Sequence, residues 1–351
     1  MAADAAARRR RRFLMVFDFD ETLANESSDD AVVRAAPGGQ QLPDWLRAQY
    51  REGRYNEHMQ RVMAWLGQQG ATEDAVRAEI QNIPETPGLA ALLDFLRAHA
   101  DDFECVVMSD ANAYFIEAWL EHTGARQLFL EIFTNPAHFD AASGRLVLAP
   151  FHAHACPRCP DNMCKQRILR DFLEARRSGR SGHQERSGGH QEHQEHQERS
   201  DGHQEHQERS DGHQERSERS GGHQEHQEHQ ERSDGHQERS ERSGGHQEHQ
   251  ERSDGHQERS DGHRERAYER VFYVGDGAND VCPCLALETQ DVAFARRDFP
   301  MHRLLTADDT HDTHTHTHTH THTHTRTAAT VQPWSSGHDV VQYLQRALEE
   351  R

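Results

Sequence analysis

Two carboxylates, Asp18 and Asp20, follow directly after the apolar run FLMVF at positions 13–17. A short run rich in Val and Phe indicates a buried strand of a parallel sheet, and such sheets carry their chemistry at the carboxyl ends of the strands. Residues two apart on a strand project from the same face, so the two acids would lie close together. Close carboxylates repel each other unless a cation is also bound. The spacing therefore predicts a cation-binding site.

Two further apolar runs, FECVVM at 103–108 and RVFYV at 270–274, also end in polar residues. Helical periodicity separates the runs, and strands that alternate with helices favour a doubly wound parallel sheet of the α/β class. The ends of parallel strands gather at one edge of the sheet. The side chains expected there, with a lysine at the start of an intervening helix, are Asp18, Asp20, Ser109, Asp110, Lys165, Asp276 and Asp280.

This set of residue types suits the hydrolysis of a phosphate monoester. Carboxylates together with phosphate oxygens and water are the ligands that Mg²⁺ prefers, and a hydroxyl, a lysine and backbone amides suit a phosphate group. One carboxylate can attack phosphorus and form an aspartyl-phosphate. A second carboxyl group can protonate the leaving oxygen and later activate water. Each motif alone is a weak signal, but the combination in this order predicts a phosphatase.

Four short motifs carry a resemblance to a known family: DFDET (18–22), SDAN (109–112), MCK (163–165) and GDGAND (275–280). They closely resemble those of the haloacid-dehalogenase-type phosphatases. Longer stretches narrow the resemblance to the phosphoethanolamine/phosphocholine phosphatases of that superfamily. These stretches are DFDETLANESSDD (18–30), CPRCPDNMCK (156–165) and YVGDGANDVCP (273–283).

The resemblance implies a role for each of these side chains. Asp18 would be the nucleophile and Asp20 the general acid and base. Ser109 and Lys165 would bind the phosphoryl group that is transferred. The ligands of Mg²⁺ would be Asp18, the backbone carbonyl of Asp20, Asp276 and, nearby or in the outer coordination sphere, Asp280.

Asp29 and Asp110 match the positions that would hold the cationic head group of the substrate. An ethanolamine or choline group needs a negative and partly desolvated partner, although Asp29 could instead cap the first helix after the strand. The resemblance implies hydrolysis of phosphoethanolamine and phosphocholine, with release of inorganic phosphate in mineralising bone or cartilage. Pyridoxal-phosphate phosphatase, or another phosphatase of the superfamily with a small substrate, is the alternative activity.

The expected fold is a haloacid-dehalogenase-like α/β core with a small helical cap inserted after the first strand. The cap would close over the substrate and exclude water. The expected parts are a basic arm at 1–12; the core at 13–29, 84–177 and 267–309; the helical cap at 30–83; a repeat insert at 178–266; a Thr-His tract at 310–327; and a C-terminal core segment at 328–351.

The repeat insert and the Thr-His tract distort the overall composition of this chain of 351 residues. The two tracts contain 22 of the 30 histidines, and the insert, with 13 Arg against 22 acidic residues, supplies −9 of the formal net charge of −20. The insert has no aromatic or branched aliphatic side chain with which to build a core, so we expect it to be disordered. The tracts could be inert linkers or could bind metal loosely. A further alternative is therefore a histidine-rich metal-binding protein on an inactive phosphatase scaffold. The complete set of acids argues against this alternative.

The charge that remains outside the tracts is also negative, which argues against nonspecific binding of nucleic acid. No stretch approaches the roughly 20 apolar residues of a membrane-spanning helix, and no signal peptide is apparent. Six cysteines in a chain of this length fit a reducing compartment. We therefore expect a soluble, cytoplasmic protein that acts on a small phosphomonoester, and the resemblance adds extracellular matrix vesicles as a location.

A second cluster of candidate ligands lies just before Lys165. Two histidines, His152 and His154, precede Cys156, Cys159 and Cys164 within thirteen residues. A Cys-x₂-Cys pair beside two histidines can form a tetrahedral zinc site. A second such pair is absent, so the cysteines could equally be thiols of a rigid, proline-rich loop. Two later cysteines, 282 and 284, are interpreted as packing residues.

Overall fold

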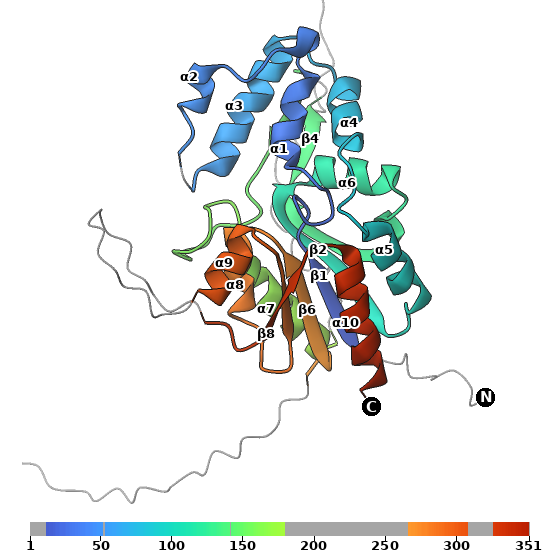
Figure 1. The fold of residues 1–351 in the computed structure, drawn as a ribbon. Helices are drawn as coiled ribbons and strands as arrows, with labels where there is room; N and C mark the ends of the chain where they lie inside the picture. The colour runs from blue at the N-terminus through green and yellow to red at the C-terminus, as the bar shows by residue number, and fades with distance from the viewer. Residues whose placement is uncertain (1–11, 52, 141, 180–265, 308–325, 351) are drawn as a thin grey trace, which may run out of the picture. The chain divides into compact units, whose positions relative to one another are not determined.

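A six-stranded parallel sheet forms the centre of the protein (Figure 1). The strand order reverses between β1 and β6, as in a doubly wound fold. The strands lie in the order β3 (Phe129–Asn135), β2 (Phe103–Asn112), β1 (Phe13–Phe17), β6 (Arg270–Gly275), β7 (Val292–Arg296) and β8 (Thr330–Trp334). The computed structural model describes residues 12–51, 53–140, 142–179, 266–307 and 326–350.

The side chains of β1 alternate between two layers of helices, as the strand period of two requires. Phe13, Met15 and Phe17 belong to one apolar cluster, and Leu14 and Val16 belong to the other. All five are buried, which explains why the strand is a continuous apolar run. The first layer contains α5 (Leu89–Ala98), α6 (Ala113–His122) and α10 (Gly337–Glu349); the second contains α7 (Lys165–Arg177), α8 (Val281–Cys284) and α9 (Pro300–Thr306).

The predicted doubly wound α/β sheet is confirmed, but β8 was not predicted as a strand. Its fourth residue is Pro333, which pairs in register with Ala295 of β7. Proline has no N–H group to donate to a neighbouring strand, so it is confined to the edges of sheets. β8 closes one edge of this sheet, where that donor is not needed.

A helical block follows β1 and lies beyond the carboxyl ends of the strands (Figure 1). It consists of α1 (Ser28–Ala31), α2 (Asp44–Arg47), α3 (Tyr55–Gln68) and α4 (Glu73–Gln81), with 3₁₀ turns at Val32–Ala35 and Pro37–Gly39. Apolar residues at helical spacing over 42–52 predict a longer helix than α2, which covers only Asp44–Arg47. Leu46 is the buried residue of α2, whereas Trp45 and Tyr50 are more than half exposed, so little apolar contact extends this helix.

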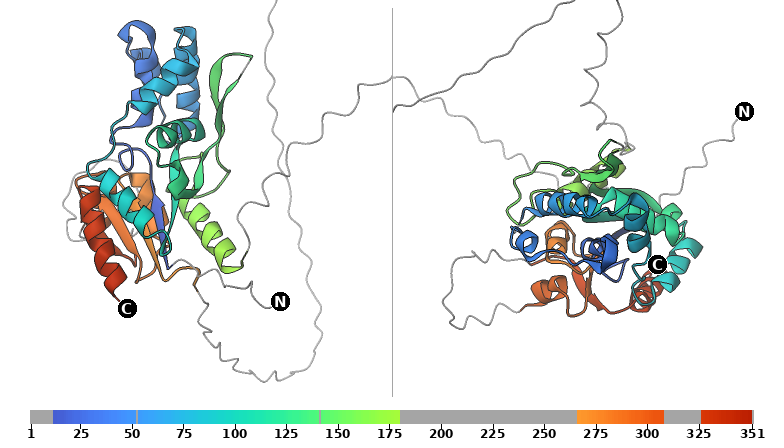
Figure 2. Two further views of the ribbon diagram at one scale, coloured as in Figure 1. Left: turned by 90° about the vertical axis from the view of Figure 1, so that its right-hand side faces the viewer. Right: turned by 90° about the horizontal axis from the view of Figure 1, so that it is seen from above.

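A two-stranded hairpin from the range expected for the core packs against this helical block. It consists of β4 (Ala137–Asp140) and β5 (Arg145–Leu148), which pair antiparallel. Gln60 of α3 donates from Nε2 to the carbonyl oxygen of Leu148 at 2.8 Å, and the rings of Tyr114 and Phe139 are in contact. Figure 2 shows the hairpin beside the helices of the block. The block is therefore completed by a segment that is distant in sequence.

Two short connecting segments join the block to the sheet and pair with each other. Ala24 and Glu85 form an antiparallel bridge. The N–H of Asn25 donates to the carbonyl oxygen of Pro84 at 2.8 Å, and that of Thr86 donates to Leu23 at 3.0 Å. Because both connections pass through this pairing, a movement of the block relative to the sheet would bend the chain here.

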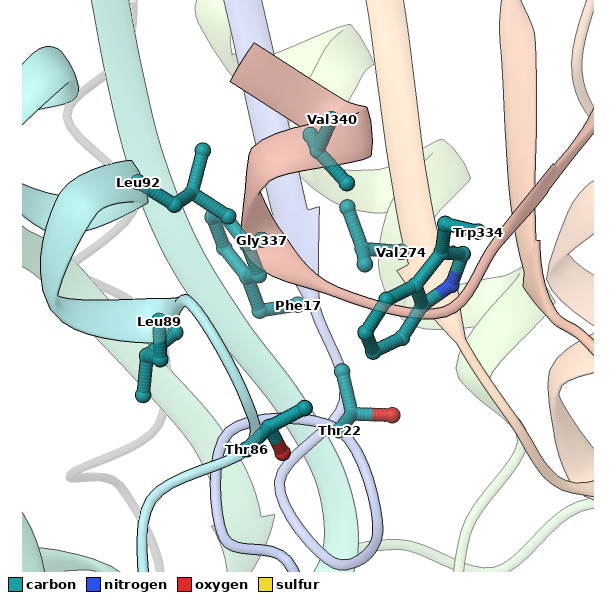
Figure 3. A pocket seen from close by; sticks show the side chains of 9 residues that line it. All are labelled: Phe17, Thr22, Thr86, Leu89, Leu92, Val274, Trp334, Gly337 and Val340. Carbon is teal, nitrogen blue, oxygen red and sulfur yellow. The ribbon is translucent and has the colours of Figure 1, made fainter.

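A small hollow lies on the sheet side of these connections, between β1, β6, β8 and the helices α5 and α10 (Figure 3). Apart from Thr22, Thr86 and Gly337, its lining is apolar, and none of the acidic candidates belongs to that lining. The hollow is therefore a packing defect of the core and is separate from the acidic edge of the sheet.

Three of the expected parts lie largely outside the described residues: the arm at 1–12, the insert at 178–266 and the Thr-His tract at 310–327. The disorder expected for the insert and the loose metal binding by histidines therefore stay predictions. Within the ranges that the structure does describe, no helix combines the length and the apolar character needed to cross a membrane.

Candidate active site

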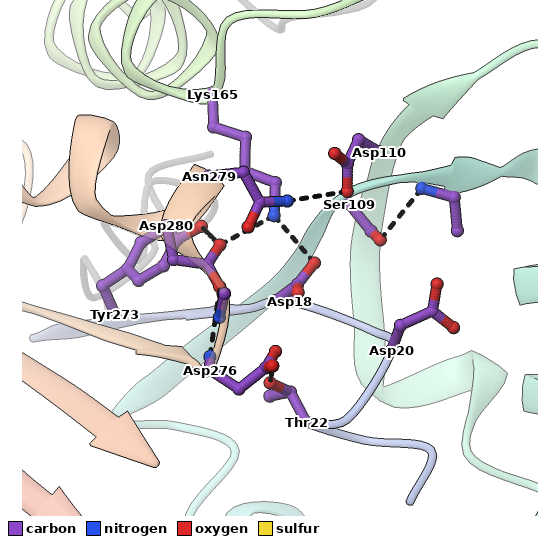
Figure 4. A network of polar contacts seen from close by, with 12 residues as sticks. Asp18, Asp20, Thr22, Ser109, Asp110, Lys165, Tyr273, Asp276, Asn279 and Asp280 are labelled. Carbon is purple, nitrogen blue, oxygen red and sulfur yellow. Dashed lines mark hydrogen bonds and ion pairs between the residues drawn. The ribbon is translucent and has the colours of Figure 1, made fainter. Parts of the chain in front are cut away.

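Three elements that are distant in sequence meet at a buried lysine (Figure 4). Lys165 is the first residue of α7, and its Nζ donates to Oδ1 of Asp18 at 2.8 Å and to Oδ1 of Asp280 at 2.7 Å. Asp18 directly follows β1, and Asp280 ends the 3₁₀ turn Ala278–Asp280 after β6. The side chains of all three are at most 5% exposed. The structure therefore joins these predicted site residues in one buried ion-pair cluster.

Both carboxylate oxygens of Asp280 are occupied by hydrogen bonds. Oδ1 also accepts from the hydroxyl of Tyr273 at 2.7 Å. Oδ2 accepts from the backbone N–H groups of Asp276 at 3.1 Å and Gly277 at 3.0 Å. Asp280 thus holds the loop after β6 in shape and holds Lys165 in place. These contacts favour the indirect role, beside the metal ion, that the resemblance allows for Asp280.

Asp276 lies across from Asp18 at the same edge of the sheet. Its Oδ1 accepts from the hydroxyl of Thr22 at 3.3 Å. Carboxylate oxygens of Asp18, Asp276 and Asp280 all lie within 4.8 Å of one another. Oxygens of Asp18 and Asp276 at this spacing, with Asp280 beside them, suit a small, hard cation such as Mg²⁺.

The pKa values at this edge show how strongly the acids repel one another. Burial and the neighbouring Asp280 raise the pKa of Asp18 well above its usual value, although Lys165 acts in the opposite direction. Burial and Asp280 likewise raise the pKa of Asp276 to about 8. Burial alone would lower the pKa of Lys165, but the charges of Asp18 and Asp280 outweigh it, and that pKa is raised. A single ammonium group does not neutralise these carboxyl groups, so a divalent cation fits the site electrostatically.

Asp20 turns away from the lysine and toward the helical block. Its Oδ1 accepts from the backbone N–H of Ser28 at 2.8 Å, and its Oδ2 accepts from the Ser28 hydroxyl at 3.1 Å. Burial raises the pKa of Asp20 to about 7, even though the bonds from Ser28 act to lower it. A carboxyl group with a pKa near neutrality can both give and take a proton, as an acid–base catalyst must.

The turn that carries Asp20 away from β1 is held from β7. Glu21 has a positive φ of 53°, a conformation that is unusual for a residue other than glycine. Arg296 donates to the backbone carbonyl oxygen of Glu21 and, at 3.0 Å, to its carboxylate. Arg296 also donates to the side-chain oxygen of Asn25. One arginine thus holds both ends of the turn that leads into the helical block.

Ser109 and Asp110 lie near the end of β2, on the opposite side of Asp18 from Asp276 (Figure 4). Ser109 is fully buried, and its Oγ accepts from the N–H of Ala111 at 3.3 Å. Oδ1 of Asp110 accepts from Nδ2 of Asn279 at 2.8 Å. This last contact ties the end of β2 directly to the loop after β6.

Asp29 extends the acidic edge into the first helix of the block. The alternative role as a helix cap is wrong, because Ser27 is the N-cap residue and accepts from the N–H of Asp30. Oδ1 of Asp29 is buried and has no hydrogen-bond partner. Burial, Asp20 and Asp110 raise the pKa of Asp29 well above its usual value. A buried carboxyl oxygen that lacks a partner, beside two other acids, suits a cationic ligand.

Sequence reasoning missed the residues that orient the acids. Tyr273, Thr22 and Asn279 each donate to an aspartate of the site, and Ser28 donates to Asp20. A sequence signal exists for Tyr273, because a tyrosine in a fully buried strand has to find a partner for its hydroxyl. Thr22 and Asn279 gave no comparable signal, since their partners come from distant segments.

The known proteins that this chain resembles are phosphatases. The family model described as Putative Phosphatase matches residues 13–186 and 255–348. The chain is 40% identical to a Danio rerio protein named "Probable phosphatase phospho1", over 99% of this chain and 93% of that protein. It is 35% identical to the phosphoethanolamine/phosphocholine phosphatase of Homo sapiens, over 98% of this chain and 92% of that protein. It is 27% identical to the Bos taurus protein named pyridoxal phosphate phosphatase PHOSPHO2, over 97% of this chain and the full length of that protein.

Replacing Lys165 by Met should destabilise the metal-free protein by about 3–5 kcal/mol at pH 8, because two buried carboxylates lose their counter-ion. The deficit should shrink toward pH 5. Lys165 acts to lower the pKa of Asp18, so its removal raises that already raised pKa further, and the folded variant gains more stability than the wild type by binding a proton as the pH falls. Urea unfolding of both proteins at the two pH values measures the change.

The matched control for that experiment is Arg167→Met, two residues along the same helix, where the side chain is 55% exposed. It should shift stability by less than about 0.5 kcal/mol. A Lys165→Met deficit that was small, or that grew toward acid pH, would contradict the buried ion-pair cluster.

Proposed function

Because this chain belongs to the Putative Phosphatase family, we propose that it is a Mg²⁺-dependent phosphomonoesterase that hydrolyses phosphoethanolamine and phosphocholine. The observation that carries the proposal is the division of the acidic edge into two parts around Asp18. One part, with Lys165 and Asp276, suits a metal ion and a phosphoryl group. The other, with Asp29 and Asp110, suits a cationic head group.

Asp18 is the proposed nucleophile. Its carboxylate attacks phosphorus, the bond from phosphorus to the alcohol oxygen breaks, and an aspartyl-phosphate is formed. Asp18, the backbone carbonyl of Asp20 and Asp276 would hold Mg²⁺, whose positive charge would stabilise the phosphoryl oxygens and the ionised acid groups. Lys165 donates to Asp18 and so holds the attacking carboxylate in one orientation. Ser109 completes the phosphoryl site from the end of β2.

Asp20 is the proposed acid and base. In the first step it gives a proton to the alcohol oxygen that leaves, and in the second it takes a proton from the water that attacks the aspartyl-phosphate. Its pKa of about 7 in the metal-free protein suits the first task, and its two bonds from Ser28 keep the carboxyl group oriented for both. Since Ser28 begins α1, the helical block itself positions this group.

Asp29 and Asp110 are the proposed partners of the ethanolamine or choline cation. A bound cation would let Asp29 ionise, which removes the cost of burying a carboxyl oxygen without a partner. A substrate with a neutral alcohol lacks this gain. Pyridoxal phosphate, on which the more distant relatives are named, has no quaternary or primary ammonium group and should be a poorer substrate.

The proposal extends to a biological role. Inorganic phosphate is the product of every turnover, and mineralising bone and cartilage consume that ion. We therefore propose phosphate supply for mineral deposition as the role of this activity, in keeping with the family resemblance.

Asp18→Asn should abolish turnover and leave the fold intact. The amide cannot attack phosphorus, and loss of a nucleophile typically lowers kcat by about 10⁴-fold or more. Phosphate release from phosphocholine and phosphoethanolamine measures the activity, and circular dichroism and the unfolding midpoint check the fold. Substantial residual turnover in a well-folded variant would refute the assigned nucleophile.

Transfer into buffer without Mg²⁺ should remove activity, and adding Mg²⁺ back should restore it. The reason is the excess of buried carboxyl groups over cations at the sheet edge. Gel filtration followed by a Mg²⁺ titration of kcat measures this dependence. Activity that persisted unchanged after this transfer and after brief treatment with chelator would exclude a dissociable Mg²⁺ ion.

Asp29→Asn should lower kcat/KM for phosphocholine and phosphoethanolamine by about 10–100-fold, because the cation loses a buried counter-ion. The kcat/KM for glycerol phosphate, whose alcohol is neutral, should change by less than about threefold. Steady-state kinetics on the three substrates, with pyridoxal phosphate as a fourth, measures the selectivity.

Asp30→Asn is the matched control, since Asp30 is adjacent, exposed and carries the same charge. It should leave all four substrates nearly unaffected. An equal loss on the neutral and cationic substrates in Asp29→Asn, or a wild-type preference for pyridoxal phosphate, would count against the proposed head-group site.

A further inference from the structure

Four cysteines gather in a second cluster, which includes the residue before Lys165. Cys156, Cys159 and Cys164 lie in the segment 149–164, which connects β5 to α7 and contains no helix or strand. Cys282 comes from α8, just after the loop of Asp276 and Asp280. A connection of this length without regular structure needs other contacts to hold it. The sulfur cluster is the place where the connection meets the loop after β6.

The structure changes the interpretation of this cluster in two ways. His154 is committed to the loop backbone, because Nδ1 accepts from the N–H of Cys156 at 3.1 Å and Nε2 donates to the carbonyl oxygen of Pro160 at 2.8 Å. Nε2 of His152 accepts from the N–H of Cys164 at 3.2 Å. The histidines thus support the loop, and the fourth member of the cluster is Cys282, which the sequence analysis interpreted as a packing residue.

The spacing of the sulfur atoms matches a tetrahedral metal site. The four Sγ atoms all lie within 4.8 Å of one another, and those of Cys156 and Cys282 are 3.7 Å apart. Zinc–sulfur bonds of about 2.3 Å place the sulfurs of a regular tetrahedron about 3.8 Å apart. A disulfide needs sulfurs about 2.05 Å apart, and all six cysteines of the chain are free. Neither of the other two, Cys105 and Cys284, belongs to the cluster.

Positive groups lie around the cluster, although burial raises the pKa of the Cys164 thiol, so a metal ion would have to displace that proton. Cys164 is the N-cap residue of α7, a helix of 13 residues whose N-terminal end carries partial positive charge. The backbone N–H of Arg167, in the first turn of that helix, donates to the Cys164 sulfur. Arg158, between Cys156 and Cys159, provides a positive charge near Cys282. These groups offset part of the negative charge of a four-thiolate site.

We propose that Cys156, Cys159, Cys164 and Cys282 bind one structural Zn²⁺ ion. Each thiol loses its proton as its sulfur coordinates the metal, and no electron transfer is involved. Four protein ligands close the coordination sphere, so the ion has no open position for substrate and is distinct from the oxygen-lined site of Asp18 and Asp276.

The position of the proposed ion would help to hold together the segments that carry Lys165 and Asp280. Cys164 directly precedes Lys165, and Cys282 lies two residues after Asp280. A zinc ion between these cysteines therefore cross-links the start of α7 to the loop after β6, immediately beside the bond from Lys165 to Asp280. The long insert separates these two segments in the chain, so the metal would add to the ion pairs and to the apolar packing of α7 against α8 that join them.

The test compares the zinc content of the full-length protein with that of two alanine variants, whose substituted positions lie two residues apart in α8. Cys282→Ala removes a ligand, whereas Cys284→Ala removes a buried thiol outside the cluster. Histidines of the two tracts can bind zinc themselves, so each protein is first dialysed against imidazole and a weak chelator. Elemental analysis should find one zinc per chain in the wild type and in Cys284→Ala, and a loss of that ion, with a lower unfolding midpoint, in Cys282→Ala.

Replacement of zinc by Co²⁺ identifies the ligands independently of activity. The wild type should show a sulfur-to-cobalt charge-transfer band and the strong visible bands of a tetrahedral site, which histidine ligands alone do not produce. Cys159→Ala, at a partly exposed position, provides a second ligand variant if Cys282→Ala does not fold. Wild-type protein without firmly bound zinc, a cobalt spectrum without the thiolate band, or four mutually oxidised cysteines would overturn the proposal. Since these readouts do not involve phosphate release, they stand apart from the proposed phosphatase activity.

Discussion

The buried ammonium group of Lys165, held between the carboxylates of Asp18 and Asp280, is the interaction on which the rest of the site depends. None of the three charges could remain ionised in this environment alone, because burial of a single charge costs several kcal/mol. Together they require β1, α7 and the loop after β6 to meet at one point. The same contacts orient the proposed nucleophile, so the stability of this edge and its chemistry have a common physical origin.

The remaining acids place negative charge on two sides of Asp18. Asp276 adds negative charge on the side of Thr22, where the spacing of oxygens suits a divalent cation. Asp29 adds it on the side of the helical block, where a carboxyl oxygen is buried without a partner. The raised pKa values of both groups have the same cause, burial together with like charges. This distribution of acids is what the proposed binding of a metal ion and of a cationic phosphoester would need.

Much of the fold and of the acidic site could be predicted from the sequence, since apolar runs mark strands and parallel strands end at a common edge. The runs before Asp18, Ser109 and Asp276 became β1, β2 and β6 in neighbouring positions of one sheet. The prediction failed where an element depends on its neighbours. β8 contains a proline that only an edge position tolerates, and β4 is defined by its pairing with β5 and its contact with α6.

The sequence by itself determined the fold class, the family and the set of polar side chains expected at the carboxyl edge of the sheet, because these follow from local patterns and short motifs. The tertiary structure alone decided which partners those side chains have. Asn279 reaches Asp110 only when β6 and β2 lie on either side of β1, and Cys282 reaches the other three cysteines only when α8 packs against the start of α7. Contacts between residues more than a hundred positions apart are set by the packing of whole elements, and spacing along the chain carries no record of them.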